Sequence, residues 1–184
     1  MILGLDISTS CTGWCVIDQS GSLIDMGYIF LSSEKTFFDK AEKVKKTFLS
    51  IRSQHDIQKI FIEENLQAFR PGFSSAKTLL TLARFNGIVS YLSQLEFCLA
   101  PQFINVNTAR RELGIKIISK KNGGDPTKEQ ILSWVAEEIK NTSYKWPTKI
   151  LKSGPRKGQK VLELFCYDMA DAYVIALSGH RMNT

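Results

Sequence analysis

The chain has 184 residues, 43% of them hydrophobic and 23% charged, which is typical of one globular domain with its own core. No apolar run approaches the ~18 residues that cross a membrane, and the start, MILGLDIST, lacks the basic segment of a secretion signal. The cysteines stand in apolar surroundings without CxxC spacing, which predicts buried free thiols. We therefore expect a cytoplasmic domain, neither secreted nor bound to a membrane, without a zinc site or disulfides.

The first two thirds of the chain alternate between strand and helix patterns. In chain order we expect strands within 1–9, 12–21 and 22–31, a helix over 37–53, a strand in 59–65, a helix over 75–96, a strand in 96–106 and a short helix near 108–113. The helix over 37–53 has Phe37 and Phe38 among its apolar positions.

The last third begins with a loop and a helix. Asp125 suits the N-cap of that helix, Pro126 its first position, and residues 127–130 resemble a capping box. A hairpin around the turn from Gly154 to Gly158 follows, and a final helix closes the chain. Antiparallel strands followed by alternating strands and helices predict an α/β fold, a mixed sheet with helices on both faces.

Most of the excess positive charge lies in one segment. The net charge is +6, and the stretch 140–162 contains seven basic residues and no acidic one, whereas the rest of the chain has 17 basic and 18 acidic residues. Such a block is usually a solvated loop, but Tyr144 and Trp146 among its lysines also suit a polyanion.

Two aspartates stand in the mostly apolar final helix, LFCYDMADAYVIAL. Asp168 and Asp171 are three residues apart and share one face, where their charges repel. One interpretation is that Asp168 caps the helix while Asp171 favours its positive N-terminal end. The other is that both face a cleft and hold a divalent cation.

Further acids support the second interpretation. Asp6 lies in the apolar strand ILGLDIST, and Glu63 and Glu64 end the strand IFIEEN. Alternation along that strand allows only one of the two glutamates to share a cleft with Asp6. Four carboxylates in one cleft would be able to bind two divalent ions about 3.5–4 Å apart, as in phosphoryl-transfer sites.

The order of these motifs resembles the RuvC-like Holliday junction resolvases of the ribonuclease H-like superfamily, along nearly the whole chain. ILGLDIST with TGWCVID is similar to the first catalytic strand and its hairpin, and FIEEN to the glutamate strand. GGDPTKEQIL is similar to the lysine-bearing helix start, and DMADAYVIAL to the last helix. The resemblance implies a five-stranded ribonuclease H-like sheet in a single nuclease domain over 1–184. The basic stretch at about 140–162 looks like an insertion, and the lysine-rich character suggests a phage or viral member.

The resemblance also implies a site and a reaction. Asp6, Glu63, Asp168 and Asp171 would bind two Mg²⁺, or Mn²⁺, and Lys128 would lie near the scissile phosphate. The expected activity is resolution of four-way or other branched DNA by paired nicks that leave 5′-phosphates. A homodimer through the helix around 75–96 is expected, although the same pattern suits an intramolecular core helix.

Contacts with DNA are expected outside the acidic cleft. The residues concerned are Lys120, Lys121, Lys145, Lys149, Lys152, Arg156, Lys157, Lys160, Arg70 and Phe69. Two features depart from the family. Ser8, Thr9 and Ser10 follow Asp6 where the family has a glycine, so these hydroxyls bind phosphate or close the turn. Leu66 stands where bacterial members have an aromatic residue.

Three other functions are compatible with parts of the pattern. A non-catalytic nucleic-acid-binding module on the same fold has no need of four carboxylates. A sugar-kinase or actin-like ATPase shares a GLDIST-like strand, but generally needs two such domains. A ribonuclease H or transposase-like nuclease would share the metal chemistry and differ in substrate.

Overall fold

The computed structural model describes residues 1–64 and 76–183 of the chain. Its centre is a five-stranded sheet in the order β3-β2-β1-β4-β5. Strands β1, β2 and β3 pair antiparallel, whereas β4 and β5 run parallel to β1, so the predicted mixed sheet is confirmed. The bounds are β1 Ile2–Asp6, β2 Cys11–Ile17, β3 Leu23–Phe30, β4 Lys59–Glu63 and β5 Gln102–Ile104.

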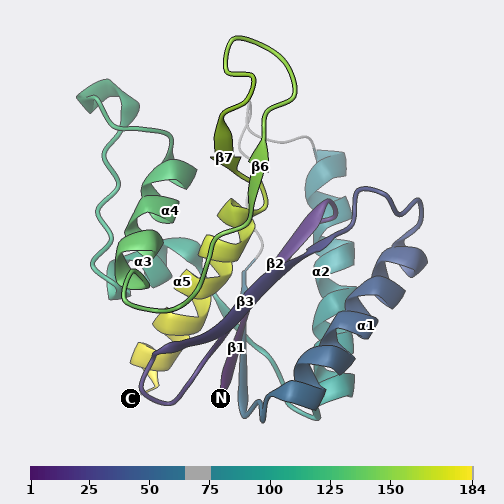
Figure 1. Cartoon of the computed structure of the whole chain (residues 1–184). Helices are drawn as coiled ribbons and strands as arrows, with labels where there is room; N and C mark the ends of the chain where they lie inside the picture. Colours follow the sequence, from purple (N-terminus) through teal and green to yellow (C-terminus); the bar gives the residue numbers. More distant parts are fainter. Residues whose placement is uncertain (65–75, 184) are drawn as a thin grey trace.

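Helices cover both faces of the sheet, as expected (Figure 1). One face carries α1, Phe37–Gln54, and α2, Ala76–Phe97. The other carries α5, Cys166–Met182, which packs directly on β1 and β2, with α3, Val106–Glu112, and α4, Thr127–Glu138, against α5. Alternate side chains of β1 therefore enter two cores, with Ile2 facing α5 and Leu3 and Leu5 facing α1 and α2.

Glycines allow α5 to lie close against the sheet. A Cβ atom on Gly13 of β2 would lie 2.0 Å from the Asp168 carbonyl oxygen, and one on Gly4 of β1 would lie 2.4 Å from that of Ala172. A Cβ on Gly179 of α5 would likewise meet the Phe61 ring at 2.3 Å. These contacts fix the height of α5 above the strands, and with it the position of the two aspartates that α5 carries.

The predicted hairpin is present beyond α4. Strands β6, Thr148–Ile150, and β7, Lys160–Leu162, pair antiparallel and stand out from the end of the molecule where α5 begins (Figure 1). Gly154 and Gly158 both have φ near +80°, at +82° and +86°, which explains glycine at the two ends of the turn.

Three sequence-based expectations are wrong in detail. Helix α4 starts at Thr127 with Pro126 as its N-cap, without a side-chain capping bond, so Asp125 is not the N-cap and Pro126 is not the first helical residue. The capping box is also absent, because the Gln130 amide donates to the carbonyl oxygens of Ile118 and Asp125 instead. A tertiary contact has replaced the local one.

Two apolar side chains expected to be buried are exposed. Phe38 is 81% exposed, because adjacent helical residues point about 100° apart and Phe37 takes the inward direction. Cys98 is also exposed, while the other three cysteines are buried, and all four are free. Within residues 1–64 and 76–183, no helix is long and apolar enough to cross a membrane.

Candidate metal-binding active site

Two strand ends bring the first pair of acids together. Strands β1 and β4 are parallel neighbours, with Leu5 opposite Ile62, so Asp6 and Glu63 are next to each other at the same edge of the sheet. Charge repulsion from Glu63 contributes to a pKa of Asp6 well above the ordinary value, after the larger effect of burial. The strand pairing alone therefore explains why these two carboxylates are close.

The start of α5 supplies the second pair. Asp168 lies in the first turn of the helix and Asp171 in the next. Phe165 occupies the N-cap position without a side-chain capping bond, so the interpretation of Asp168 as a helix cap is wrong. Both aspartates are directed to the cleft that Asp6 and Glu63 also line.

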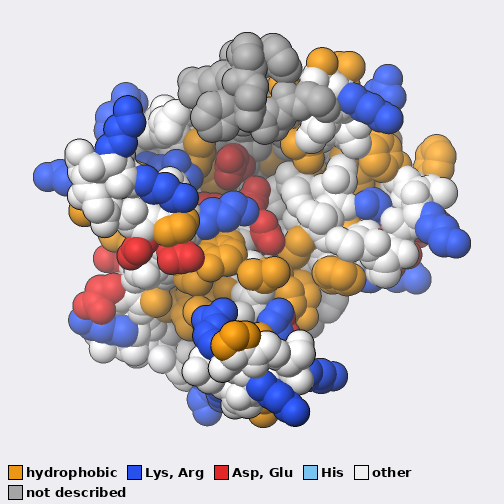
Figure 2. Space-filling view, turned by 90° about the horizontal axis from the view of Figure 1, so that it is seen from above, with side chains coloured by type: hydrophobic (Ala, Val, Ile, Leu, Met, Phe, Trp, Pro, Cys, Tyr) orange, Lys and Arg blue, Asp and Glu red, His pale blue; other side chains and the backbone are white. Residues whose placement is uncertain are grey.

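The cleft has a volume of about 460 Å³ and is lined mainly by polar residues. Figure 2 shows acidic side chains at the bottom of a hollow with lysines and arginines around it. Among the described residues, the ionisable side chains that line the cleft are Asp6, Glu63, Glu64, Asp168, Asp171, Arg110 and Lys128. Five acidic groups thus face two basic ones.

Burial, with mutual repulsion as a smaller cause, raises the pKa of Asp6, Glu63 and Asp171. Burial, then the Asp171 charge, raises the pKa of Glu63 to about 7. Burial raises the pKa of Asp171 to about 6, although Arg110 and Lys128 act in the opposite direction. The pKa of Asp168 is raised as well, again by burial. The two basic side chains leave a surplus of negative charge in the cleft.

Glu63 belongs to this electrostatic network. The Glu63 carboxyl group interacts with those of Asp6 and Asp171. Both glutamates line the cleft, and the backbone N–H of Glu64 donates to the Ile104 carbonyl oxygen at 2.9 Å. Alternation along β4 left the choice open, and the network with Asp6 favours Glu63.

Lys128 and Arg110 are the basic groups of the cleft. The ammonium nitrogen of Lys128, at the start of α4, is 4.0 Å from an Asp168 carboxylate oxygen, and its side chain is 63% exposed. Arg110 of α3 lowers the pKa of both Glu63 and Asp171. Its Nε atom is buried without a hydrogen-bond partner in the part of the chain that the structure describes.

Arg110 is the residue of the cleft that the sequence did not single out. It lies in TARREL beside Arg111, and neither arginine carries a recognisable motif. The available signal is weak. Arg110 is a basic residue on the short helix α3, and α3 follows β5, which runs parallel to the glutamate strand β4. Only the packing of α3 against α5 brings it to the acids.

The serines after Asp6 close the turn between β1 and β2. The Ser8 hydroxyl donates to the Cys11 carbonyl oxygen at 2.6 Å and accepts from the Cys11 N–H at 3.1 Å. The Lys40 ammonium group of α1 donates to the Thr9 carbonyl oxygen. Of the two roles considered for these hydroxyls, turn closure is the one that Ser8 has.

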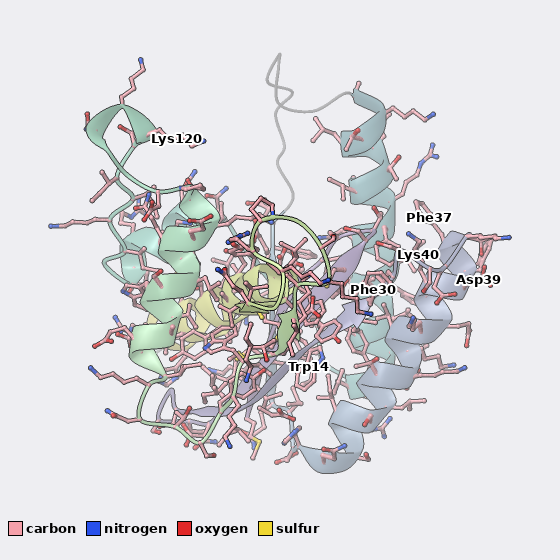
Figure 3. All side chains as sticks on the ribbon, turned by 45° about the horizontal axis from the view of Figure 1, so that its top comes forward. Trp14, Phe30, Phe37, Asp39, Lys40 and Lys120 are labelled. Carbon is pink, nitrogen blue, oxygen red and sulfur yellow. The ribbon has the colours of Figure 1, made fainter. Side chains whose placement is uncertain are left out.

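The residues expected to contact DNA lie around the cleft rather than in it. Lys120 and Lys121 are exposed on a loop before α4, with Lys120 at the periphery of the molecule (Figure 3). Lys152, Arg156, Lys157 and Lys160 are exposed on the β6–β7 hairpin, Lys149 is half-buried in it, and Lys145 is exposed just before it. Phe69 and Arg70, like Leu66, fall outside the described residues.

The donor set of the cleft fits hard divalent cations. Carboxylate oxygens are the ligands that Mg²⁺ and Mn²⁺ prefer, and the surplus negative charge favours binding of a cation. In the described residues, no three Asp, Glu, His or Cys side chains are gathered closely enough to form a ready-made site. The carboxylates would therefore have to turn toward an ion entering the cleft.

Comparison with solved structures identifies the fold. RuvC of T. thermophilus in complex with Holliday junction substrate has a TM-score of 0.65 at 15% identity, over 99% of this chain and 93% of that one. A second Thermus thermophilus RuvC structure gives 0.61 at 16%, over 99% and 94%. The yeast mitochondrial Holliday junction resolvase Ydc2 gives 0.56 at 16%, over 98% and 77%. No protein-family model and no curated protein sequence matches.

Proposed function

We propose that this chain, which has the fold of the RuvC Holliday junction resolvases, is a metal-dependent endonuclease that cuts branched DNA. The observation that carries the proposal is the meeting of Asp6, Glu63, Asp168 and Asp171 in one cleft. Three separate elements deliver these acids to the same edge of the sheet. Such a concentration of buried negative charge is costly unless it serves to bind cations.

The four carboxylates would hold the metal ions, Mg²⁺ or Mn²⁺. When bound, two such ions would activate a water for attack on the phosphodiester and stabilise the departing 3′-oxygen, leaving a 5′-phosphate. The acids contribute by fixing the position of the ions with respect to the scissile phosphate.

Lys128 and Arg110 would act on the phosphate. Lys128 is exposed at the mouth of the cleft beside Asp168, so its ammonium group is free to move to a phosphate oxygen. Arg110 is half-buried, and its buried Nε–H has no acceptor within the described part of the chain. Both groups would offset the charge that builds on the phosphate in the transition state.

Paired nicks at a four-way junction need two active sites related by a twofold axis, and α2 is the proposed dimer interface. Its side away from the sheet exposes Leu80, Tyr91 and Leu95 at 61%, 65% and 52%. Gly87 lies on the same side with open space above its Cα. An apolar stripe at helical spacing on an outer helix is suited to a second copy of the same helix.

The decisive experiment compares labelled DNA substrates. A mobile four-way junction, a Y-junction and a linear duplex are incubated with the wild type and with Asp6→Asn, with and without Mg²⁺. We expect paired, metal-dependent nicks in the four-way junction and none with the variant. Equal cutting of all branched forms would indicate a broader nuclease, and cutting of RNA–DNA hybrids a ribonuclease. Binding without cutting would leave only a nucleic-acid-binding module.

A further inference from the structure

The β6–β7 hairpin has one face that is fully open to solvent. Its register places Thr148 opposite Leu162 and Ile150 opposite Lys160, so these four side chains project from the same side. All four are exposed, whereas Lys149 and Val161 on the other side are half-buried. The hairpin therefore has an inner side against the protein and an outer side without a partner in the described chain.

The outer side carries large aliphatic side chains. Ile150 and Leu162 are 64% and 40% exposed, and Leu164, two residues after Leu162, is 70% exposed. One exposed aliphatic residue is ordinary, but two on the hairpin and a third just after it form a patch whose burial by a partner is favourable.

Positive charge surrounds this patch. Lys152, Arg156 and Lys157 at the tip and Lys160 on the outer side are exposed, and none forms an ion pair with an acidic side chain in residues 1–64 or 76–183. The segment from 140 to 162 contains no acid. The partner that this charge fits is a polyanion, and aliphatic side chains beside it suit the faces of nucleobases.

The base of the hairpin is tied to the part of the molecule that holds the catalytic acids. The ammonium group of Lys149 lies 3.0 Å from a Glu163 carboxylate oxygen. Phe165 stacks on Tyr28 of β3 with ring centroids 3.4 Å apart. Asp168 follows Phe165 by one helical turn, so the hairpin has a fixed position relative to the cleft.

We propose that the outer side of the β6–β7 hairpin is a wedge that holds open the bases at the branch point of the DNA. Its aliphatic side chains contact unstacked bases while the basic tip binds the phosphates of the arms. This inference rests on the proposed function, because it takes branched DNA as the substrate of the neighbouring cleft. Figure 2 looks onto this end of the molecule, where basic and hydrophobic side chains border the acidic hollow.

The test measures base unstacking separately from cutting. A four-way junction with 2-aminopurine at its central base pair is bound in the Asp6→Asn background, where fluorescence rises if the base unstacks. The wedge variant is Ile150→Ser with Leu162→Ser. The matched control is Ile24→Ser with Leu49→Ser, two aliphatic side chains that are each 44% exposed elsewhere. Cutting is measured with the same pairs of substitutions in the wild-type background.

We expect the control to keep the fluorescence rise and the wedge variant to lose most of it. Junction cutting by the wedge variant should fall about tenfold, equivalent to about 1.4 kcal/mol, with unchanged binding of linear duplex. Retained duplex binding shows that the variant is folded. Neutralising Lys152, Arg156 and Lys157 with Gln should instead weaken binding of every DNA and reduce its salt dependence.

The outcomes separate the two proposals. If the wedge variant and the control give the same fluorescence and the same cutting, the wedge proposal is wrong and the nuclease proposal stands. The same conclusion follows if the only change in the wedge variant is its oligomeric state. If unstacking depends on the wedge residues but the wild type cuts no DNA, only the nuclease proposal is wrong. A protein that binds no branched DNA would overturn both.

Discussion

Replacing Glu63 with glutamine should remove activity and yet stabilise the metal-free protein. The carboxyl group of Glu63 ionises at about 7 in the folded chain, against 4.5 for an ordinary glutamate, mainly because it is buried beside other acids. At about 1.4 kcal/mol for each pH unit, its charged form costs the folded state about 3 kcal/mol above pH 7. Glutamine keeps the size of the side chain and removes this cost.

The pH dependence follows from the same difference. Between pH 4.5 and about 7 the folded protein binds more protons at Glu63 than the unfolded chain does. The free energy of unfolding of the wild type therefore falls as pH rises through this window, and the Glu63 contribution is constant above it. Glu63→Gln should lose that part of the slope and be the more stable protein at pH 8 by up to about 3 kcal/mol.

Urea denaturation at pH 5 and pH 8, with a chelator present to keep the protein free of metal, measures this difference in the free energy of unfolding. The matched control is Glu112→Gln, an exposed glutamate on α3, which should follow the wild type. Addition of Mg²⁺ at pH 8 should stabilise the wild type more than Glu63→Gln, because ion binding removes the repulsion that glutamine has already removed. A variant with the same pH slope as the wild type would refute the assignment of Glu63 to the charged network.

Three further predictions concern neighbours of the acids. Gly13→Ala should lower the free energy of unfolding by about 1–3 kcal/mol in denaturant, because its Cβ would clash with the backbone of α5, and an unchanged stability would contradict that contact. Lys128→Gln should lower kcat for junction cutting about 10²-fold with little change in binding, and an unchanged kcat would exclude a role at the phosphate. Arg110→Gln should shift the rise of the pH–rate profile to higher pH, because Arg110 lowers the pKa of Glu63 and Asp171; an unshifted profile would contradict that coupling.

The elements and the acids could be predicted because their signals are local. Strand alternation and helical spacing are properties of neighbouring residues, and the ends of parallel strands necessarily meet at one edge. These rules predicted that Asp6 meets one of the two glutamates at the end of IFIEEN, and the choice of Glu63 was implied by the family resemblance. The register of β4 against β1 is what places Glu63 beside Asp6.

What could not be predicted depends on tertiary contacts. The side chain of Gln130 bonds to Ile118 rather than to its own helix start, and no local pattern contains that information. Arg110 becomes part of the cleft only because α3 packs against α5. The ion pair between Lys149 and Glu163 likewise determines which face of the hairpin is turned to the protein and which is exposed.

The site is assembled from opposite ends of the chain. Asp6 is at the end of the first strand, and Asp168 and Asp171 are on the last helix, which packs directly on β1 and β2. A chain in which α5 has not docked therefore lacks two of the four carboxylates at this edge, and the proposed metal site forms only when α5 packs on β1 and β2.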